Sequence, residues 1–130
     1  MNSLAELVQL YQKFGDETAF VYHRGYRTPR WTYGQTAELA FRFAWELGRR
    51  NIGKGDRVVL WGQNSPEWVA AFVGCMLRGA VAVPMDRIAA PDLCSAWPAT
   101  FKPNWLSARV LWRNGSKNGT ILSWRHLLKY

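Results

Sequence analysis

The stretch DRVVLWGQNSPEWVAAFVGCMLRGAVAVPMD, residues 56–86, decides the fold of this chain. Residues 57–61 begin with Arg and continue with four apolar residues, which is typical of a strand covered on both faces of a parallel sheet. Residues 80–83 form a second apolar run that ends at Pro84, and we expect another buried strand there. The two runs are too far apart for a hairpin, so the residues between them must form a crossover.

The segment between these two strands predicts a capped helix. Ser65 is a strong N-cap, Pro66 suits the first helical position, and Glu67 complements the positive end of the helix dipole. An apolar run follows and ends at Gly79, where a glycine can terminate a helix. Strand, helix and strand predict one βαβ crossover unit, which is right-handed in parallel sheets.

The residues before this unit predict two helices and a hairpin. Ser3 can cap a helix that runs to about Phe14, with apolar residues on one face. Residues 18–23 and 29–32 predict two short antiparallel strands around a turn. Thr32 and Gln35 then have the spacing of a capping box, and the helix that follows should run to about Arg50.

Residues 87–130 differ in composition from residues 1–86. The first 86 residues hold ten Lys or Arg and eight Asp or Glu, whereas the last 44 hold seven basic residues and one acid, Asp92. The same region contains four of the eight Trp and three of the six Pro. It shows no sustained helical period before about Thr120. We therefore expect residues 1–86 to form an α/β domain segment, with a partial doubly wound parallel sheet and the N-terminal antiparallel hairpin. Residues 87–130 are expected to be an irregular, basic, Trp-rich tail, in which residues 120–130 could form a short helix or strand.

Two loops are candidate phosphate sites. Residues 48–54 have the spacing G-x-x-x-x-G-K, but Gly55 replaces the hydroxyl that would hold magnesium, and the segment closes a helix where a phosphate loop opens one. The favoured interpretation is a helix exit. Residues 62–65 have the correct polarity, after a strand and before a helix, but only one glycine. Capping by Ser65 is the favoured role there, with anion binding as the alternative.

Other chemistry is not indicated by the sequence. Cys75 lies in an apolar helical pattern and is predicted to be a buried hydrophobic residue, while Cys94, His23 and His126 have no ligand-like neighbours. The N-terminus lacks the features of a signal peptide, and no apolar run has the character of a membrane span. We therefore expect a cytoplasmic protein with no catalytic, cofactor-binding or metal-binding residue in this chain.

The spacing of individual residues supports a family resemblance. Over roughly residues 14–86 the chain resembles the N-terminal part of the acyl-adenylate-forming (AMP-binding) enzymes, closest to the AMP-forming acyl-CoA synthetases, or fatty-acid–CoA ligases. The pattern joins a T-Y helix start to G-D-x-V, N-S-x-E-W and G-A-x-x-V-P. The matching residues are Thr32, Tyr33, Gly55, Asp56, Val58, Asn64, Ser65, Glu67, Trp68, Gly79, Ala80, Val83 and Pro84.

The resemblance implies a function for the intact family that this chain does not carry in full. Such enzymes use ATP and Mg²⁺ to convert a carboxylic acid to an acyl-adenylate, then transfer the acyl group to CoA. Their Pro-Lys-Gly phosphate loop, Tyr-Gly-x-Thr-Glu motif, ribose-binding Asp and late catalytic Lys have no counterpart here, so no catalytic residue is carried over. We therefore expect a truncated piece of such a ligase that is inactive alone and needs no cofactor by itself.

Several alternatives remain open at the level of sequence. The Trp and Arg residues of the tail could form a small basic module that binds nucleic acid or an anionic membrane, although the scattered charges make nucleic acid the weaker expectation. The tail could be a frameshift product or a lineage-specific extension. The chain could instead pair with the remainder of a split enzyme, or self-associate or aggregate through open sheet edges around residues 57–61 and 80–83.

Overall fold

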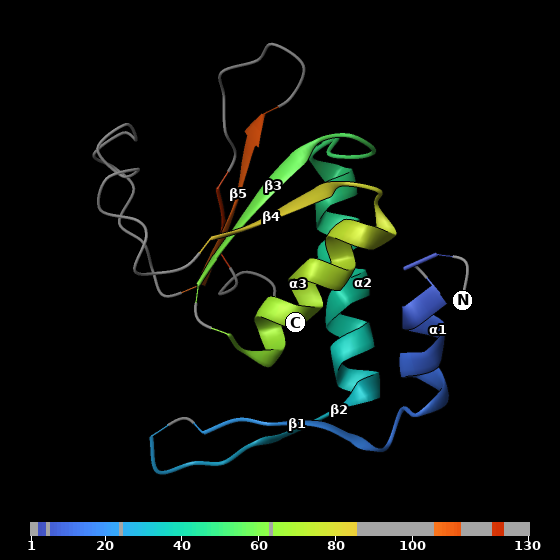
Figure 1. The fold of residues 1–130 in the computed structure, drawn as a ribbon, viewed down its shortest axis with the longest axis vertical. Coiled ribbons are helices and arrows are strands. Elements are labelled where there is room, and N and C mark those ends of the chain that lie inside the picture. Colours follow the sequence, from blue (N-terminus) through green and yellow to red (C-terminus); the bar gives the residue numbers. More distant parts are fainter. Residues whose placement is uncertain are drawn as a thin grey trace.

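A computed structural model describes residues 3–4, 6–23, 25–62, 64–85, 106–112 and 121–123, with the last two ranges described by their backbone alone. Figure 1 shows the helices beside a sheet, with a separate hairpin at the far end of the helices. The elements are, in chain order, α1 (Glu6–Lys13), β1 (Thr18–Val21), β2 (Arg30–Thr32), α2 (Tyr33–Arg49), β3 (Arg57–Gly62), α3 (Pro66–Leu77), β4 (Val81–Met85), β5 (Leu106–Trp112) and β6 (Ile121–Ser123).

The predicted crossover unit is confirmed. β3 and β4 are parallel and in register from Arg57 opposite Val81 to Trp61 opposite Met85, with α3 between them in sequence. The Ser65 hydroxyl accepts a hydrogen bond from the Trp68 N–H at 3.2 Å, as an N-cap should. The helix gives way to a turn at Gly79, whose φ of 67° lies in the left-handed region that glycine tolerates best.

β4 differs from its prediction as a fully buried strand. Val81 is 48% exposed, and Ala82 and Val83 are half-buried. The strand also continues through Pro84 to Met85 instead of stopping at the proline. The reason is its place in the sheet: β4 is the end strand in the order β4-β3-β5-β6. Proline, which lacks an N–H, is tolerated at such an edge.

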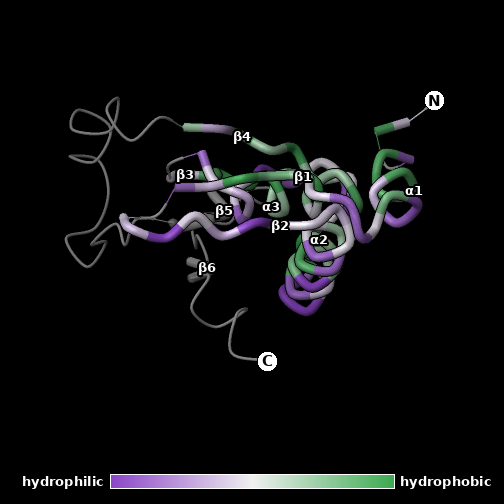
Figure 2. Tube along the Cα trace, turned by 90° about the horizontal axis from the view of Figure 1, so that it is seen from below, coloured by the Kyte–Doolittle hydropathy of each residue, from purple (hydrophilic) through white to green (hydrophobic). Residues whose placement is uncertain are grey.

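α2 begins at the predicted capping box. The Gln35 N–H donates to the Thr32 hydroxyl at 3.1 Å, and the Thr32 N–H donates to the Gln35 side-chain oxygen at 3.0 Å. The helix packs its apolar face against α3 and α1, and its alternation of hydrophilic and hydrophobic residues can be followed in Figure 2. Phe43 and Leu47 are fully buried on this face. The apolar face predicted from the sequence is therefore the face that packs in the core.

The α2–α3 contact depends on one small residue. A Cβ placed on Gly74 of α3 would lie 2.8 Å from both the Ala40 carbonyl oxygen and Phe43 Cδ1 of α2. The two helix backbones therefore approach more closely than a larger residue would allow. The hydrophobic core lies around this contact and includes Val58 and Leu60 of β3.

The N-terminal hairpin is confirmed, with shorter strands than predicted. β1 and β2 are antiparallel, with Thr18 opposite Thr32 and Val21 opposite Arg30. Figure 1 shows this ribbon running away from the main sheet. The Tyr33 N–H donates to the Glu17 carbonyl at 3.0 Å, and the Gly34 N–H donates to the Gly15 carbonyl at 2.9 Å. These bonds connect the end of α1 to the start of α2.

Two segments of the tail are strands. The prediction of an irregular tail is therefore wrong for residues 106–112, whereas the strand at residues 121–123 lies in the stretch for which a short helix or strand is predicted. β5 pairs antiparallel with β3, with Leu60 opposite Ala108, and β6 pairs antiparallel with β5. The sheet is therefore mixed, with one parallel pair. The expectation of an open edge on β3 is also wrong, because β3 has a neighbour on each side. The other predictions for the tail lie outside the described residues.

Candidate functional site

The loop that leaves α2 uses its backbone N–H groups within the fold. The N–H groups of Asn51 and Ile52 donate to the carbonyls of Gly48 and Leu47, both at 2.9 Å. The Gly53 N–H donates to the Asp56 carboxylate at 2.9 Å, and the Gly55 N–H donates to the Gly79 carbonyl at 3.2 Å. A phosphate loop needs such groups free and pointing at the ligand, so this arrangement supports the predicted helix exit.

Arg78 reinforces the same loop from the end of α3. Its guanidinium donates to the Ile52 carbonyl from Nε and Nη2, each at 3.4 Å. The same group lies 3.3 Å from the position of a Cβ on Gly48. Arg78 therefore joins the exits of the two helices. The contact could not be predicted from the sequence, because no residue near Arg78 indicates a partner 26 residues away.

The loop that leaves β3 is also used for helix capping. Besides the hydroxyl cap, the Ser65 carbonyl accepts the Val69 N–H at 3.1 Å, and Gln63 lies outside the described residues. Glu67 lies on the first turn of α3 and is only 3% exposed. Its carboxylate places a negative charge at the end of the helix where an external anion would bind. The geometry thus favours capping over anion binding, and the burial of Glu67 is a feature that the sequence did not reveal.

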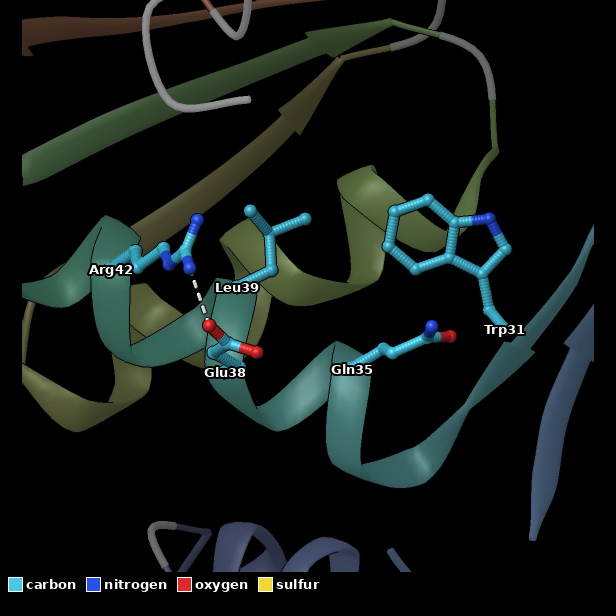
Figure 3. A pocket seen from close by; sticks show the side chains of 5 residues that line it. All are labelled: Trp31, Gln35, Glu38, Leu39 and Arg42. Atoms are coloured by element: carbon cyan, nitrogen blue, oxygen red, sulfur yellow. Dashed lines mark hydrogen bonds and ion pairs between the residues drawn. The ribbon is translucent and has the colours of Figure 1, made fainter. Parts of the chain in front are cut away.

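A shallow pocket lies along α2, at its junction with β2. Figure 3 shows it lined by Trp31, Gln35, Glu38, Leu39 and Arg42. Arg42 forms an ion pair with Glu38, and Gln35 is engaged in the capping box. The volume is about 130 Å³, well below the roughly 300 Å³ at which small-molecule pockets begin. This pocket can hold solvent but not a nucleotide.

Burial within the packed fold shifts the pKa values of two titratable groups. Burial raises the pKa of the Cys75 thiol to about 12, so the thiol is a poor nucleophile at neutral pH. Burial, with a smaller effect from Tyr33, raises the pKa of Tyr11. Within the ranges whose side chains are described, no cluster of His, Cys, Asp or Glu could hold a metal ion. None of the described helices is long and apolar enough to cross a membrane.

The match to a family model decides the relationship. Residues 8–96 match the model of the AMP-binding enzyme. The chain belongs to the AMP-binding enzyme family. The matched residues 8–96 of this chain include most of α1 and every described element from β1 to β4. β5 and β6 lie beyond the matched segment.

Individual AMP-binding enzymes agree with this assignment. The chain is 48% identical over 65 residues to the long-chain-fatty-acid–CoA ligase FadD13 of Mycobacterium tuberculosis, covering 49% of the chain and 13% of that protein. It is 38% identical over 80 residues to the putative acyl-CoA synthetase YngI of Bacillus subtilis, covering 62% and 14%. In structure it is similar to a fatty acid AMP ligase from Legionella pneumophila, with a TM-score of 0.64 at 26% identity, covering 72% and 16%. The chain thus spans about one-seventh of the length of these AMP-binding enzymes.

The motif residues shared with the AMP-binding enzymes have structural roles in the fold. Thr32 and Ser65 cap helices, Gly55 and Gly79 occupy left-handed backbone positions, and Asp56 accepts the Gly53 N–H. The motif is therefore a signature of how this part of the AMP-binding fold is assembled. The prediction that the chain contains no catalytic, cofactor-binding or metal-binding residue stays a prediction.

Proposed function

We propose that residues 8–85 are the opening scaffold of an AMP-forming acyl-CoA ligase, and that the 130-residue chain does not catalyse adenylation alone. The reaction of the complete enzyme joins a carboxylate to the α-phosphate of ATP with release of pyrophosphate. The thiol of CoA then displaces AMP to give the acyl-CoA. A fatty acid is the proposed substrate class, because FadD13 and the Legionella ligase are named for fatty acids.

One observation carries the proposed inactivity. The two loops that could have held phosphate both use their polar groups internally: Gly53 and Gly55 donate to partners of the fold, and Ser65 caps α3. Adenylation requires preorganised donors around the phosphates and the developing charge at the reacting carboxylate. Without such donors in these two loops, the part of the chain that the structure describes offers no group to stabilise that transition state.

ATP–pyrophosphate exchange tests this proposal. The purified chain, Mg²⁺, ATP, labelled pyrophosphate and palmitate should give no label in ATP above a reaction without protein. The M. tuberculosis ligase FadD13 is the positive control under the same conditions. Fatty-acid-dependent exchange above background, retained through purification, would overturn the proposal.

A complementary partner would explain how such a scaffold could contribute to catalysis. We propose the remainder of a split ligase as that partner, because the chain spans only 13–16% of the AMP-binding enzymes described above. The cytoplasm is the proposed location, since ATP and CoA are supplied there. Co-expression with a polypeptide carrying the remaining ligase motifs should restore exchange activity if the partner exists.

Binding of nucleic acid or an anionic membrane by residues 87–130 is the alternative function. The excess of basic residues in this segment supports it, but the pairing of β5 with β3 gives part of the segment a role within the sheet. Binding of this kind would weaken steeply with salt. A salt titration against duplex DNA and phosphatidylserine vesicles tests the alternative, and no binding at about 50 mM salt would exclude it.

A further inference from the structure

β3 obtains its two neighbours from different parts of the chain. β4 pairs with it in parallel and belongs to residues 8–96, the segment that matches the AMP-binding family. β5 pairs with it antiparallel over Arg57–Gly62 and begins ten residues beyond that segment, at Leu106. The family-matched part therefore covers one edge of β3, and the last third of the chain covers the other.

If the β3 edge that β5 covers were open, it would favour strand pairing between molecules. Val58, Val59, Leu60 and Trp61 are uncharged, have high strand propensity and are at most 6% exposed. An exposed strand of this kind presents unpaired N–H and C=O groups and is a template for strand addition. Because β5 is antiparallel to β3, the β3 strand of a second copy could take its place about a two-fold axis.

The sheet as a whole ends in protected strands. On one side the last described strand is β4, where Pro84 lacks a backbone donor. On the other side the last described strand is β6, which has only three residues. A short edge strand and an edge proline are two of the ways in which proteins discourage edge-to-edge pairing.

We propose that the β5–β6 hairpin is a cap that closes the β3 edge, within the same chain, against strand addition by a second copy. The cap gives the basic tail a role that is independent of acyl activation. When the hairpin opens, β3 becomes available and the chain forms a dimer through paired β3 strands. When the hairpin is held closed, the chain stays monomeric.

A reversible cross-link tests the cap. Arg57 of β3 and Trp112 of β5 are direct partners, and cross-strand partners lie within the Cα separation that a disulfide spans. We would prepare Arg57→Cys with Trp112→Cys in a Cys94→Ala background, so that the disulfide ties the hairpin to β3; Cys75 is buried and does not compete. Oxidation should slow hydrogen exchange of the β3 amides by roughly tenfold or more, because it limits opening of the hairpin.

The amides of α2 provide the internal control. Oxidation should leave their exchange unchanged, since the cap opens without unfolding the helix pair, and reduction should reverse the effect on β3. Equal slowing in β3 and α2 would mean that exchange requires global unfolding, and no slowing in β3 would mean that the hairpin does not cover it. Either result would overturn the proposal.

A substitution tests what happens when the cap is lost. Val110 lies opposite Val58, and Val110→Pro removes a backbone donor and disfavours strand pairing. With α2 amides still protected, this variant should form a dimer at concentrations where the matched control Val110→Thr is a monomer by light scattering. A monomeric Val110→Pro variant with protected α2 and exposed β3 amides would contradict the proposal. If Val110→Pro unfolds the chain, the cross-link experiment decides.

Discussion

α2 and α3 pack against each other, but they differ in the polarity of their other faces. α2 has a charged outer face, where Arg42 pairs with Glu38 and where Arg49 and Arg50 both pair with Glu46. α3 has no such face: its half-buried positions are Trp68, Val69, Phe72, Met76 and Leu77. A polar outer face is typical of a helix at a protein surface, whereas a helix that is apolar all round is typical of an interior.

The two helices therefore have different roles in the same fold: α2 presents a surface, and α3 is part of the interior. Hydrogen bonds hold the exit loop of α2 to Arg78 and Gly79, at the end of α3, although the loop has the residue spacing of a phosphate loop. α3 begins at a loop with the polarity of an anion site, but Ser65 caps the helix there and Glu67 is buried on its first turn. In both places the identity of the residues matters less than whether their backbone donors remain available.

The largest expected effect is a loss of stability at high pH, caused by the buried Cys75 thiol of α3. The pKa of Cys75 is raised from 9.0 to about 12 by burial, so above pH 9 the unfolded chain loses a proton that the folded chain retains. The free energy of unfolding should therefore fall between about pH 9 and 12, by as much as ~4 kcal/mol from this thiol. Urea denaturation at several pH values measures it. Cys75→Ala should reduce the slope; an unchanged slope would show that other groups, such as Tyr11, cause it.

The contact between the helices is the next most sensitive point. In Gly74→Ala the new methyl group would lie 2.8 Å from the Ala40 carbonyl and Phe43 Cδ1, and overpacking should lower stability by about 2 kcal/mol. Gly53→Ala is the matched control, since the nearest atom to its Cβ is 3.9 Å away. Urea midpoints compare the two variants. Equal stability would show that α2 and α3 are not packed as closely as described.

The helix caps should have equal effects in spite of the different helix faces. Thr32→Ala removes the acceptor for the Gln35 N–H on α2, and Ser65→Ala removes the acceptor for the Trp68 N–H on α3. Each substitution should lower stability by ~1 kcal/mol. If Ser65→Ala instead has no effect on stability, capping is not the role of Ser65 and the anion-binding alternative for residues 62–65 gains support.

The smallest expected effect is on the outer face of α2. Glu38→Gln removes the ion pair with Arg42, which lies in solvent, and should change stability by at most ~0.5 kcal/mol. The change should diminish in about 0.5 M salt, which screens exposed charges. A loss greater than that of a cap variant would mean that the pocket of Trp31 and Arg42 is a more rigid site than its exposure indicates.

Much of this fold could be predicted from local signals. The capping box at Thr32, the Ser65–Pro66 helix start and the apolar run of β3 each carry their structural information within a few residues. What could not be predicted depends on pairing between distant segments. β5 joins β3 from nearly fifty residues away, and its strand is not marked by regular alternation of polar and apolar residues.

The structural roles of the two candidate loops could be predicted from local sequence. The helical context of residues 48–54 and the Ser65–Pro66 helix start each indicate such a role. The burial of Glu67 and the reach of Arg78 to Ile52 could not be inferred, because both depend on which face of α3 packs inward. A helix that is apolar all round gives no such direction.

A titration of the purified chain with Mg²⁺–ATP tests the central claim most directly. Because the N–H groups of Gly53 and Gly55 are engaged within the fold, calorimetry should detect no saturable binding up to about 1 mM nucleotide. The same experiment with Lys54→Ala should be indistinguishable. Saturable binding in the native chain that Lys54→Ala abolishes would contradict the account, because residues 48–54 would then act as a phosphate loop.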